Sequence, residues 1–397
     1  MKAGWEVKTL GELFKTGAGG TPLKSKKEYY DGGSIPWILS GEVSQGEIKE
    51  AKNFINQKGL ENSSARIFPK NTVLVAMYGA TAGQVGILRF DACTNQAVCG
   101  ILPNDNFISE FVLYFLLSRK NELLAQATGN AQPNISQIKI KNIDFPVVSI
   151  PEQQRIVKLL DTAFACIATV KANTEQNLKN ARALFDSYLH EVFSKRGEGW
   201  EVKTLGEVCN LMTGGTPSKS NDNYFSGNIK WLVSGDIHQK EIFDCNGRIT
   251  EEGLNNSNAK FLPVNSVMMA LNGQGKTRAT VAILRTTATC NQSLAAIIPK
   301  KFDKLLPEYL YYNLHGRYQE LRTMTGDSGN DRRGLNMILI RKIEVPIPPL
   351  PEQQRIVLKL DSLQKQTQRL ETLYQSKLTA LDELKKALLH KAFNGEL

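Results

Sequence analysis

The hydrophobic positions follow two successive patterns along the chain. Up to about residue 145, short apolar runs are separated by Gly, Pro, Asn and Ser, as in "IPWILSGEV" and "NTVLVAMYGATAGQVGILRF". Apolar runs of this length between turn-forming residues predict short strands, with one or two helices over 107–127. After the "PEQQ" that begins at Pro151, neither glycine nor proline occurs for more than forty residues. The pattern therefore predicts a strand-rich domain that leads into one long helix.

In the glycine-free run the apolar positions step by three and four from Val157 to Val192, and a second run from Ile356 to Leu388 does the same. This spacing over about five heptads is typical of a coiled coil. Each helix would be roughly 60 Å long at about 1.5 Å per residue. One interpretation is a helix lying along its neighbouring domain. A second interpretation is that the two helices pair with each other and leave one side free for a partner. Polar residues in the middle of the apolar pattern favour this second interpretation. These residues are Lys171, Thr174, Thr367 and Lys377.

The two runs belong to an internal duplication of about 195 to 200 residues, which a search for repeats finds first. "WEVKTLGE" occurs at Trp5 and again, identical, at Trp200. "GGTP" follows in both copies, and each copy closes with "PEQQRIV", at Pro151 and at Pro351.

The duplication and the two patterns together predict the fold class. We expect an α/β (α+β) chain of two homologous globular domains with mixed and antiparallel sheets. Two long coiled-coil helices join them, and an internal pseudo-two-fold repeat relates the halves. The predicted boundaries are 1–148 and 197–346 for the domains, with 149–196 and 347–397 for the helical segments.

Charge points to the class of partner. Among 397 residues, 49 Lys and Arg against 39 Asp and Glu give a formal net charge of +10. A basic balance favours a polyanion over an acidic metabolite. Because the excess is spread over both copies and both helices, each domain carries its own share.

Other classes of protein are excluded by composition and motif. The six cysteines form no CxxC pair and the four histidines are isolated, so we predict reduced thiols, no metal site and no disulfide scaffold. The first residues do not form a secretory signal, and no run of about 18 apolar residues occurs, so we expect a cytoplasmic protein without a membrane partner. No hydrolytic or transferase constellation is present, and we predict no catalytic residue.

The stretch "ALNGQGKTRAT" fits a relaxed phosphate-loop pattern, which gives a nucleotide hydrolase using Gly275, Lys276 and Thr277 as an alternative. Its counterpart in the first copy, "AMYGATAGQVG", has no Lys-Thr. A phosphate loop also needs a helix to start at the lysine, whereas "TRATVAILR" predicts a strand. We therefore predict a hairpin loop whose Gln274, Lys276 and Arg278 contact a DNA phosphate.

Two further polar, glycine-containing stretches lie between apolar runs. They are "TPLKSKKEYY", matched by "TPSKSNDNYF", and "TGNAQPNISQIK", matched by "TGDSGNDRRGLNMIL". Their side chains are of the kinds that contact phosphates and base edges, and they differ between copies while their flanks do not. The predicted DNA contacts in these stretches and in the two hairpins are Lys24, Lys26, Lys27, Tyr29, Tyr78, Thr81, Gln84, Asn130, Gln132, Asn134, Lys219, Asn221, Asn272, Gln274, Lys276, Arg278, Arg332 and Arg333.

With these residues laid out, the whole chain resembles the specificity subunit of Type I restriction-modification enzymes. The most specific marks are "SIPEQQRIV" and "PLPEQQRIV" at the starts of the long helices, the two "WEVKTLGE" stretches and the C-terminal "AFNGEL". The resemblance implies two target-recognition domains, each for one half of a split, asymmetric site in double-stranded DNA. It also implies that the two long coiled-coil helices pair antiparallel and set the gap between the half-sites.

The resemblance further implies the partners and cofactors. Two modification subunits would carry S-adenosylmethionine and methylate an adenine in each half-site. Restriction subunits would add ATP- and Mg-dependent translocation and cleavage, while this chain would bind no cofactor. The residues expected to contact partners or shape the spacer are Pro151, Glu152, Gln153, Gln154 and Arg155, with Pro351, Glu352, Gln353, Gln354 and Arg355. A coiled-coil adaptor without DNA binding is the remaining alternative.

Overall fold

The structure is a computed structural model that describes residues 5–125, 134–194, 197–273, 277–324 and 334–397. Its packing divides the chain into two compact units. The first unit is Met1–Glu175 with Ser376–Leu397, and the second unit is Gln176–Gln375.

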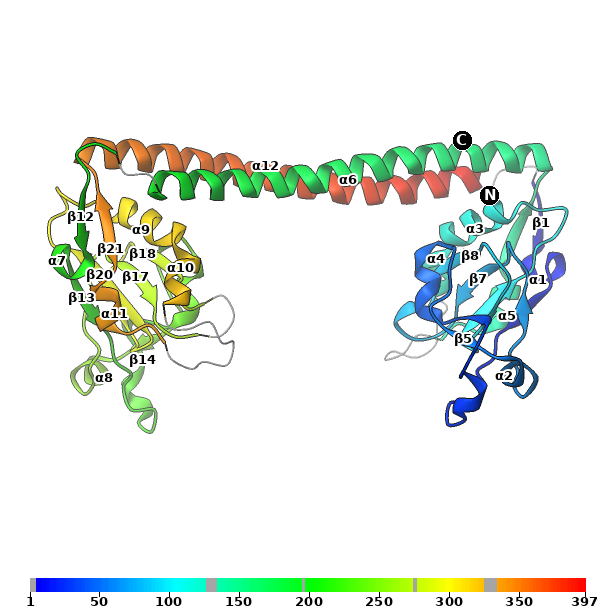
Figure 1. Cartoon of the computed structure of the whole chain (residues 1–397), viewed down its shortest axis with the longest axis horizontal. Coiled ribbons are helices and arrows are strands. Elements are labelled where there is room, and N and C mark those ends of the chain that lie inside the picture. The colour runs from blue at the N-terminus through cyan, green and yellow to red at the C-terminus, as the bar shows by residue number, and fades with distance from the viewer. Residues whose placement is uncertain (1–4, 126–133, 195–196, 274–276, 325–333) are drawn as a thin grey trace. The chain divides into compact units, whose positions relative to one another are not determined.

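The first unit begins with β1 and ends its domain with β11, directly before the long helix α6 (Figure 1). The strands are β1 (Glu6–Thr9), β2 (Thr16–Ala18), β3 (Ile35–Ile38), β4 (Glu47–Ile48), β5 (Phe54–Ile55), β6 (Ile67–Phe68), β7 (Val73–Ala76), β8 (Val85–Leu88), β9 (Ala92–Thr94), β10 (Val98–Ile101) and β11 (Asp144–Val147). The helices are α1 (Leu10–Leu13), α2 (Gln57–Glu61), α3 (Ser109–Ser118), α4 (Lys120–Ala125), α5 (Gln137–Lys141) and α6 (Ile150–Ser194).

The second unit repeats this order, except that its described residues form no counterpart of β6. Its strands are β12 (Glu201–Thr204), β13 (Cys209–Thr213), β14 (Phe225–Leu232), β15 (Glu241–Ile242), β16 (Arg248–Ile249), β17 (Val267–Ala270), β18 (Val281–Leu284), β19 (Thr289–Cys290), β20 (Leu294–Pro299) and β21 (Glu344–Ile347). Its helices are α7 (Leu205–Val208), α8 (Glu251–Asn255), α9 (Pro307–Gly316), α10 (Tyr318–Thr323), α11 (Met337–Arg341) and α12 (Leu350–Asn394).

Each unit is built on a five-stranded sheet, in the order β2-β10-β7-β8-β4 and, in the second unit, β13-β20-β17-β18-β15. The ladders are antiparallel except for the last pair, β4 with β8 and β15 with β18, which is parallel. A smaller sheet, β5-β3-β9-β6 or β16-β14-β19, and a two-stranded ribbon, β1-β11 or β12-β21, complete each domain.

The central strands are apolar at every position because both faces of the sheet are covered. In β7 the side chains of Val73 and Val75 join the core under α3, whereas Leu74 and Ala76 join a separate core on the other face. Alternate residues of a strand point to opposite faces, so a fully apolar run is what a doubly covered strand requires.

Both long helices contribute to the main core of each unit. In the first unit, Ile156 and Leu160 of α6 and Phe393 of α12 join the core that contains α3. In the second unit, Phe185 of α6 and Leu360 of α12 do the same. Each unit therefore holds its domain against a segment of both helices.

The two helices are antiparallel, since Arg155 bonds the carbonyl of Leu397 while Lys171 pairs with Asp382 at 2.9 Å. The polar seam residues of α6 are satisfied. Thr174 is 1% exposed and donates its hydroxyl to the Val170 carbonyl at 2.7 Å.

The predicted fold class is confirmed, with two related domains of mixed and antiparallel sheets and two 45-residue helices. In the predicted stretch 107–127, the described residues up to 125 form two helices, α3 and α4, that meet at Arg119. The predicted segment boundaries at 148, 196 and 346 stay predictions, because packing groups parts of both helices with each domain.

Candidate nucleic-acid interface

The strands on either side of the Gly-Lys-Thr pattern form a hairpin, as predicted. β17 and β18 pair antiparallel, with Val267 opposite Ile283, and the Ala270 amide donates to the Thr280 carbonyl at 3.0 Å. Residues 277–280 form a turn that leads directly into β18, so no helix begins there. A nucleotide site needs that helix terminus, and the hydrolase alternative is therefore not supported. Gln274 and Lys276 lie outside the described residues, and Arg278 is half-buried.

The matching hairpin of the first unit connects β7 to β8 through a single 3-10 turn, Gly79–Thr81. Tyr78 is 39% exposed at its start, and Thr81 is half-buried. Gln84 accepts a hydrogen bond from the Lys120 ammonium at 3.1 Å. Gly83 has φ +75°, and a Cβ there would press on Leu124, so glycine is required.

The loop "TPLKSKKEYY" exposes Lys24, Lys26 and Lys27 at the end of the first unit opposite to α6 and α12 (Figure 1). Tyr29 departs from the prediction. Its ring is 7% exposed, and the Lys26 ammonium lies over it, 5.2 Å from the centroid. Because the ring packs into the domain, Tyr29 supports the loop and is not placed to contact a base.

The counterpart loop in the second unit exposes Lys219. Asn221 uses its side-chain oxygen to accept a hydrogen bond from the Asn223 amide at 3.1 Å, so it caps a short 3-10 turn. The loop therefore offers one exposed lysine where the first unit offers three.

The residues that end the third loop lie beside the hairpin in each unit. The Ile135 amide donates to the Met77 carbonyl at 2.8 Å, and the Leu335 amide to the Leu271 carbonyl at 2.9 Å. Asn134 thereby comes next to Tyr78, with which it forms a β-bridge. Asn272 is exposed, and Gly334 approaches its side chain so closely that no Cβ fits. Asn130, Gln132, Arg332 and Arg333 lie outside the described residues.

One surface feature beside these loops was missed by sequence reasoning. Ile138 of α5 and Ile338 of α11 are each 68% exposed, at equivalent places just after the third loop. Basic side chains follow on the same short helices, Lys139 and Lys141 in the first unit and Arg341 in the second. The sequence signal that could have revealed this feature is an isoleucine at the same place in both copies, at a position that belongs to no periodic apolar pattern.

The "PEQQR" motif has a different structural role at its first glutamine from the one predicted. Gln153 and Gln353 are fully buried, and each side-chain amide bonds backbone atoms of its own domain. They are therefore unavailable to a partner. Glu152 pairs with Arg155 at 2.8 Å, and Pro151 and Gln154 are exposed. The second copy repeats this arrangement with Pro351, Glu352, Gln354 and Arg355.

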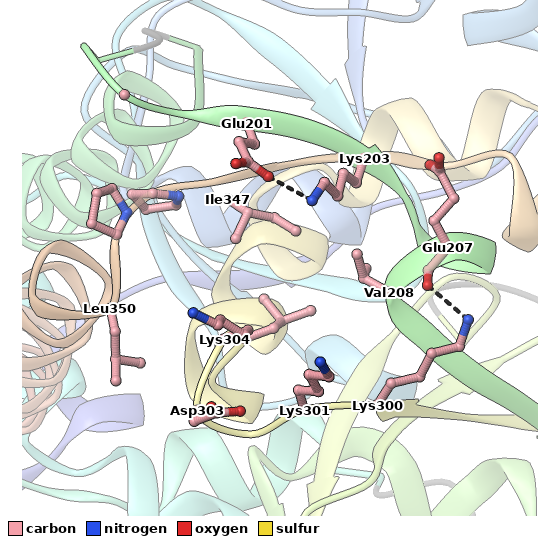
Figure 2. Close-up of a pocket in the computed structure, with 14 residues that line it drawn as sticks. Glu201, Lys203, Glu207, Val208, Lys300, Lys301, Asp303, Lys304, Ile347 and Leu350 are labelled. Carbon is pink, nitrogen blue, oxygen red and sulfur yellow. Dashed lines mark hydrogen bonds and ion pairs between the residues drawn. The ribbon is translucent and has the colours of Figure 1, made fainter.

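A pocket of about 610 Å³ opens in the second unit beside β12 and the start of α12 (Figure 2). Its charged lining is Glu201, Lys203, Glu207, Lys300, Lys301, Asp303 and Lys304. Glu201 pairs with Lys203 at 2.5 Å, and Lys300 donates to the Glu207 carbonyl at 2.7 Å. Because carboxylates stand among the lysines, this pocket does not form a uniform surface for a polyanion.

Within the described residues, the histidines, cysteines and acids form no group of three or more that could hold a metal ion. All six cysteines are free thiols, and burial raises the pKa of Cys93 to about 11 and that of Cys99 to about 12. Such thiols stay protonated and unreactive. No helix among the described residues is long and apolar enough to cross a membrane.

Two similar domains, each with basic and polar loops at one end and a long helix packed along its core, define a duplicated DNA-specificity architecture. The Type I restriction modification DNA specificity domain matches this chain twice, at residues 2–180 and 197–380. The chain belongs to the family of Type I restriction-modification specificity subunits, and the resemblance noted from the sequence is confirmed.

Two relatives match over most of the chain. The Type I restriction enzyme MjaIX specificity subunit of Methanocaldococcus jannaschii is 28% identical, over 99% of this chain and 93% of its own. The EcoR124I/EcoR124II specificity subunit of Escherichia coli is 27% identical, over 89% of this chain and 85% of its own.

Solved structures share the fold. A chain from work on complex assembly and conformational transition of the type I R-M system has a TM-score of 0.80 and 23% identity, covering 100% of this chain and 99% of that one. The HsdS subunit from Thermoanaerobacter tengcongensis has a TM-score of 0.66 and 22% identity, covering 100% and 98%.

Proposed function

We propose that each domain reads one half of a split, asymmetric DNA site. The observation that carries this proposal is the contrast between frame and loops. The two units share their five-stranded sheets, their two-stranded ribbons and their attachments to the long helices, while the first polar loop, at the end away from the helices, differs in sequence and charge. Two unequal readers on one frame suit two unequal half-sites, with phosphate contacts for register and base-edge contacts for sequence.

The paired helices set the spacer and dock the modification subunits. Support comes from apolar side chains left exposed on them, which a subunit packing against the helices would cover. These are Leu184, Leu358, Leu370, Leu373 and Leu384, between 36% and 70% exposed. Pro151, Gln154 and Arg155, with their counterparts in the second unit, lie at the starts of the same helices.

The chain acts without catalysis of its own. Its two modification subunits supply S-adenosylmethionine and methylate adenine in each half-site, and restriction subunits supply ATP- and Mg-dependent cleavage. The complex works on chromosomal DNA in the cytoplasm of a bacterium or archaeon. Membership of the family supports this division of labour.

A domain exchange tests the proposal. Residues 1–148 are replaced by the corresponding domain of a relative, and modified adenines are mapped in cells that also express the modification subunits. We expect one half-site of the methylated motif to change while the other half-site stays as in wild type. An unchanged motif, or a change in both half-sites, would contradict the assignment of one half-site to each domain.

A further inference from the structure

Each domain is fastened to the helix that follows it by a buried glutamine. Gln153 accepts from the Ile108 amide at 2.8 Å and donates to the carbonyls of Asn106 and Val148 at 3.0 and 2.9 Å. Gln353 makes the same three bonds in the second unit, at 2.9, 2.8 and 2.9 Å. This attachment fixes where the first turn of the long helix meets the domain.

A second attachment lies eight residues further along each helix. Tyr114 of α3 donates its hydroxyl to Asp161 of α6, and Tyr312 of α9 donates to Asp361 of α12 at 2.6 Å. Burial, followed by the bond to the aspartate, raises the pKa of both tyrosines, so each stays a protonated donor. The bond is charge-assisted and directional, unlike the apolar packing around it.

Two attachment points between a domain and its helix fix the orientation of the domain, whereas a single point does not. At about 1.5 Å per residue, eight residues separate the glutamine from the aspartate by about 12 Å along the helix axis. With the glutamine alone, the domain could tilt about the first helical turn. The hydroxyl-to-carboxylate bond opposes that tilt.

We propose that Tyr114 with Asp161 and Tyr312 with Asp361 are positioning pairs, which set the tilt of each domain on its helix and thereby the spacer length that the protein accepts. This inference rests on the proposed function of the helices as the element that sets the spacer. The pairs touch no base, and they act through the orientation of the domain that does.

The two positioning pairs are not equal in strength. In the second unit the Lys240 ammonium also bonds Asp361 at 2.5 Å, the Tyr312 hydroxyl at 2.8 Å and Gln364 at 3.2 Å. The first unit has Gly46 at this place, since its carbonyl accepts from the Ile87 amide as that of Lys240 accepts from Ile283. Among the described residues, no cation bonds Asp161 beside Tyr114, whereas Lys240 reinforces the pair of Tyr312 and Asp361.

The test uses the full chain expressed with its modification subunits, and maps methylated adenines genome-wide for wild type, Y114F and Y312F. We expect all three to methylate the same two half-sites. In Y114F, sites with a spacer one base pair longer or shorter should rise about fivefold relative to the native spacer, the factor that one lost hydrogen bond corresponds to. Y312F should show a smaller rise, because Lys240 still holds Asp361.

The matched control is Y309F. Tyr309 lies on the same helix as Tyr312 and donates to the Pro346 carbonyl at 2.6 Å, so this variant loses an equivalent buried bond that stays inside the domain. It should keep the native spacer preference. The inference is overturned if Y114F keeps that preference, if Y309F relaxes it equally, or if the half-sites themselves change. A wild type without a split motif would instead refute the proposed function.

Discussion

The first and second units keep the same bonds where the frame is held together. Trp37 and Trp231 each donate the indole N–H to a glycine carbonyl at 3.0 Å, that of Gly20 and of Gly215. Arg89 bridges Glu47 and Glu110, as Arg285 bridges Glu241 and Glu308. These bonds have survived the divergence of the two copies because each satisfies a buried or half-buried polar group that the fold cannot leave unpaired.

The units differ in charge and polarity at the surface. The first polar loop has three exposed lysines in the first unit and one in the second. At another surface position the first unit has Asn104 and Asp105, and the second unit has Lys300 and Lys301. The comparison teaches that the bonds of the frame are kept, while residues that differ between the units, such as Lys240 and Lys300, add bonds particular to one unit. Variants that remove a shared bond should therefore affect both units alike, and variants at divergent places should affect one.

The largest effect is expected at the buried glutamines. Q153L and Q353L keep the side-chain volume but leave two carbonyls and one amide without partners, at a cost of about 3 kcal/mol in unfolding free energy. The two losses should agree within about 1 kcal/mol. Urea denaturation followed by circular dichroism measures them. A stable Q353L beside a destabilised Q153L would show that the two attachments are not equivalent.

How much of this could be read from sequence depended on the range of the interaction. The hairpin after Ala270 was predictable because strand propensity and the duplicate loop are local signals. The burial of Gln153 was not, because its partners at 106–108 are over forty residues away and the motif itself reads as polar. The prediction that Tyr29 contacts DNA failed for the same reason. Its lysine neighbours indicate an exposed loop, whereas its ring packs into the interior.

The next effect concerns the first loop and DNA. If its exposed lysines contact phosphates, the triple variant K24Q/K26Q/K27Q should reduce the slope of log affinity against log salt by about three units. K219Q in the second unit should reduce it by about one unit. DNA binding by the assembled complex, titrated between low and moderate salt, gives both slopes. Equal slopes for the two variants would show that the loops do not contact DNA in the manner proposed.

The smallest expected effect is a difference between the two units in how their stability depends on pH. His315 of α9 stacks on Tyr311 with ring centroids 5.4 Å apart, and the equivalent residue of α3 is Leu117. Burial lowers the pKa of His315 below 6.5, with nearby Lys240 acting in the same direction and Asp186 opposing. As pH falls below 6.5, the unfolded chain binds the proton before the folded one does, so stability declines.

H315L should remove this decline, and L117H should introduce one in the first unit. The measurement is the unfolding free energy of wild type and of each variant at pH 7.5 and at pH 5.5. Comparing the change with pH between a variant and wild type removes the contribution of the bonds that both units share. The decline should be smaller than the loss in Q153L, since a single imidazole is involved. If H315L keeps the full wild-type decline, the acid sensitivity resides in the bonds that both units share, and the contrast between the units does not extend to pH.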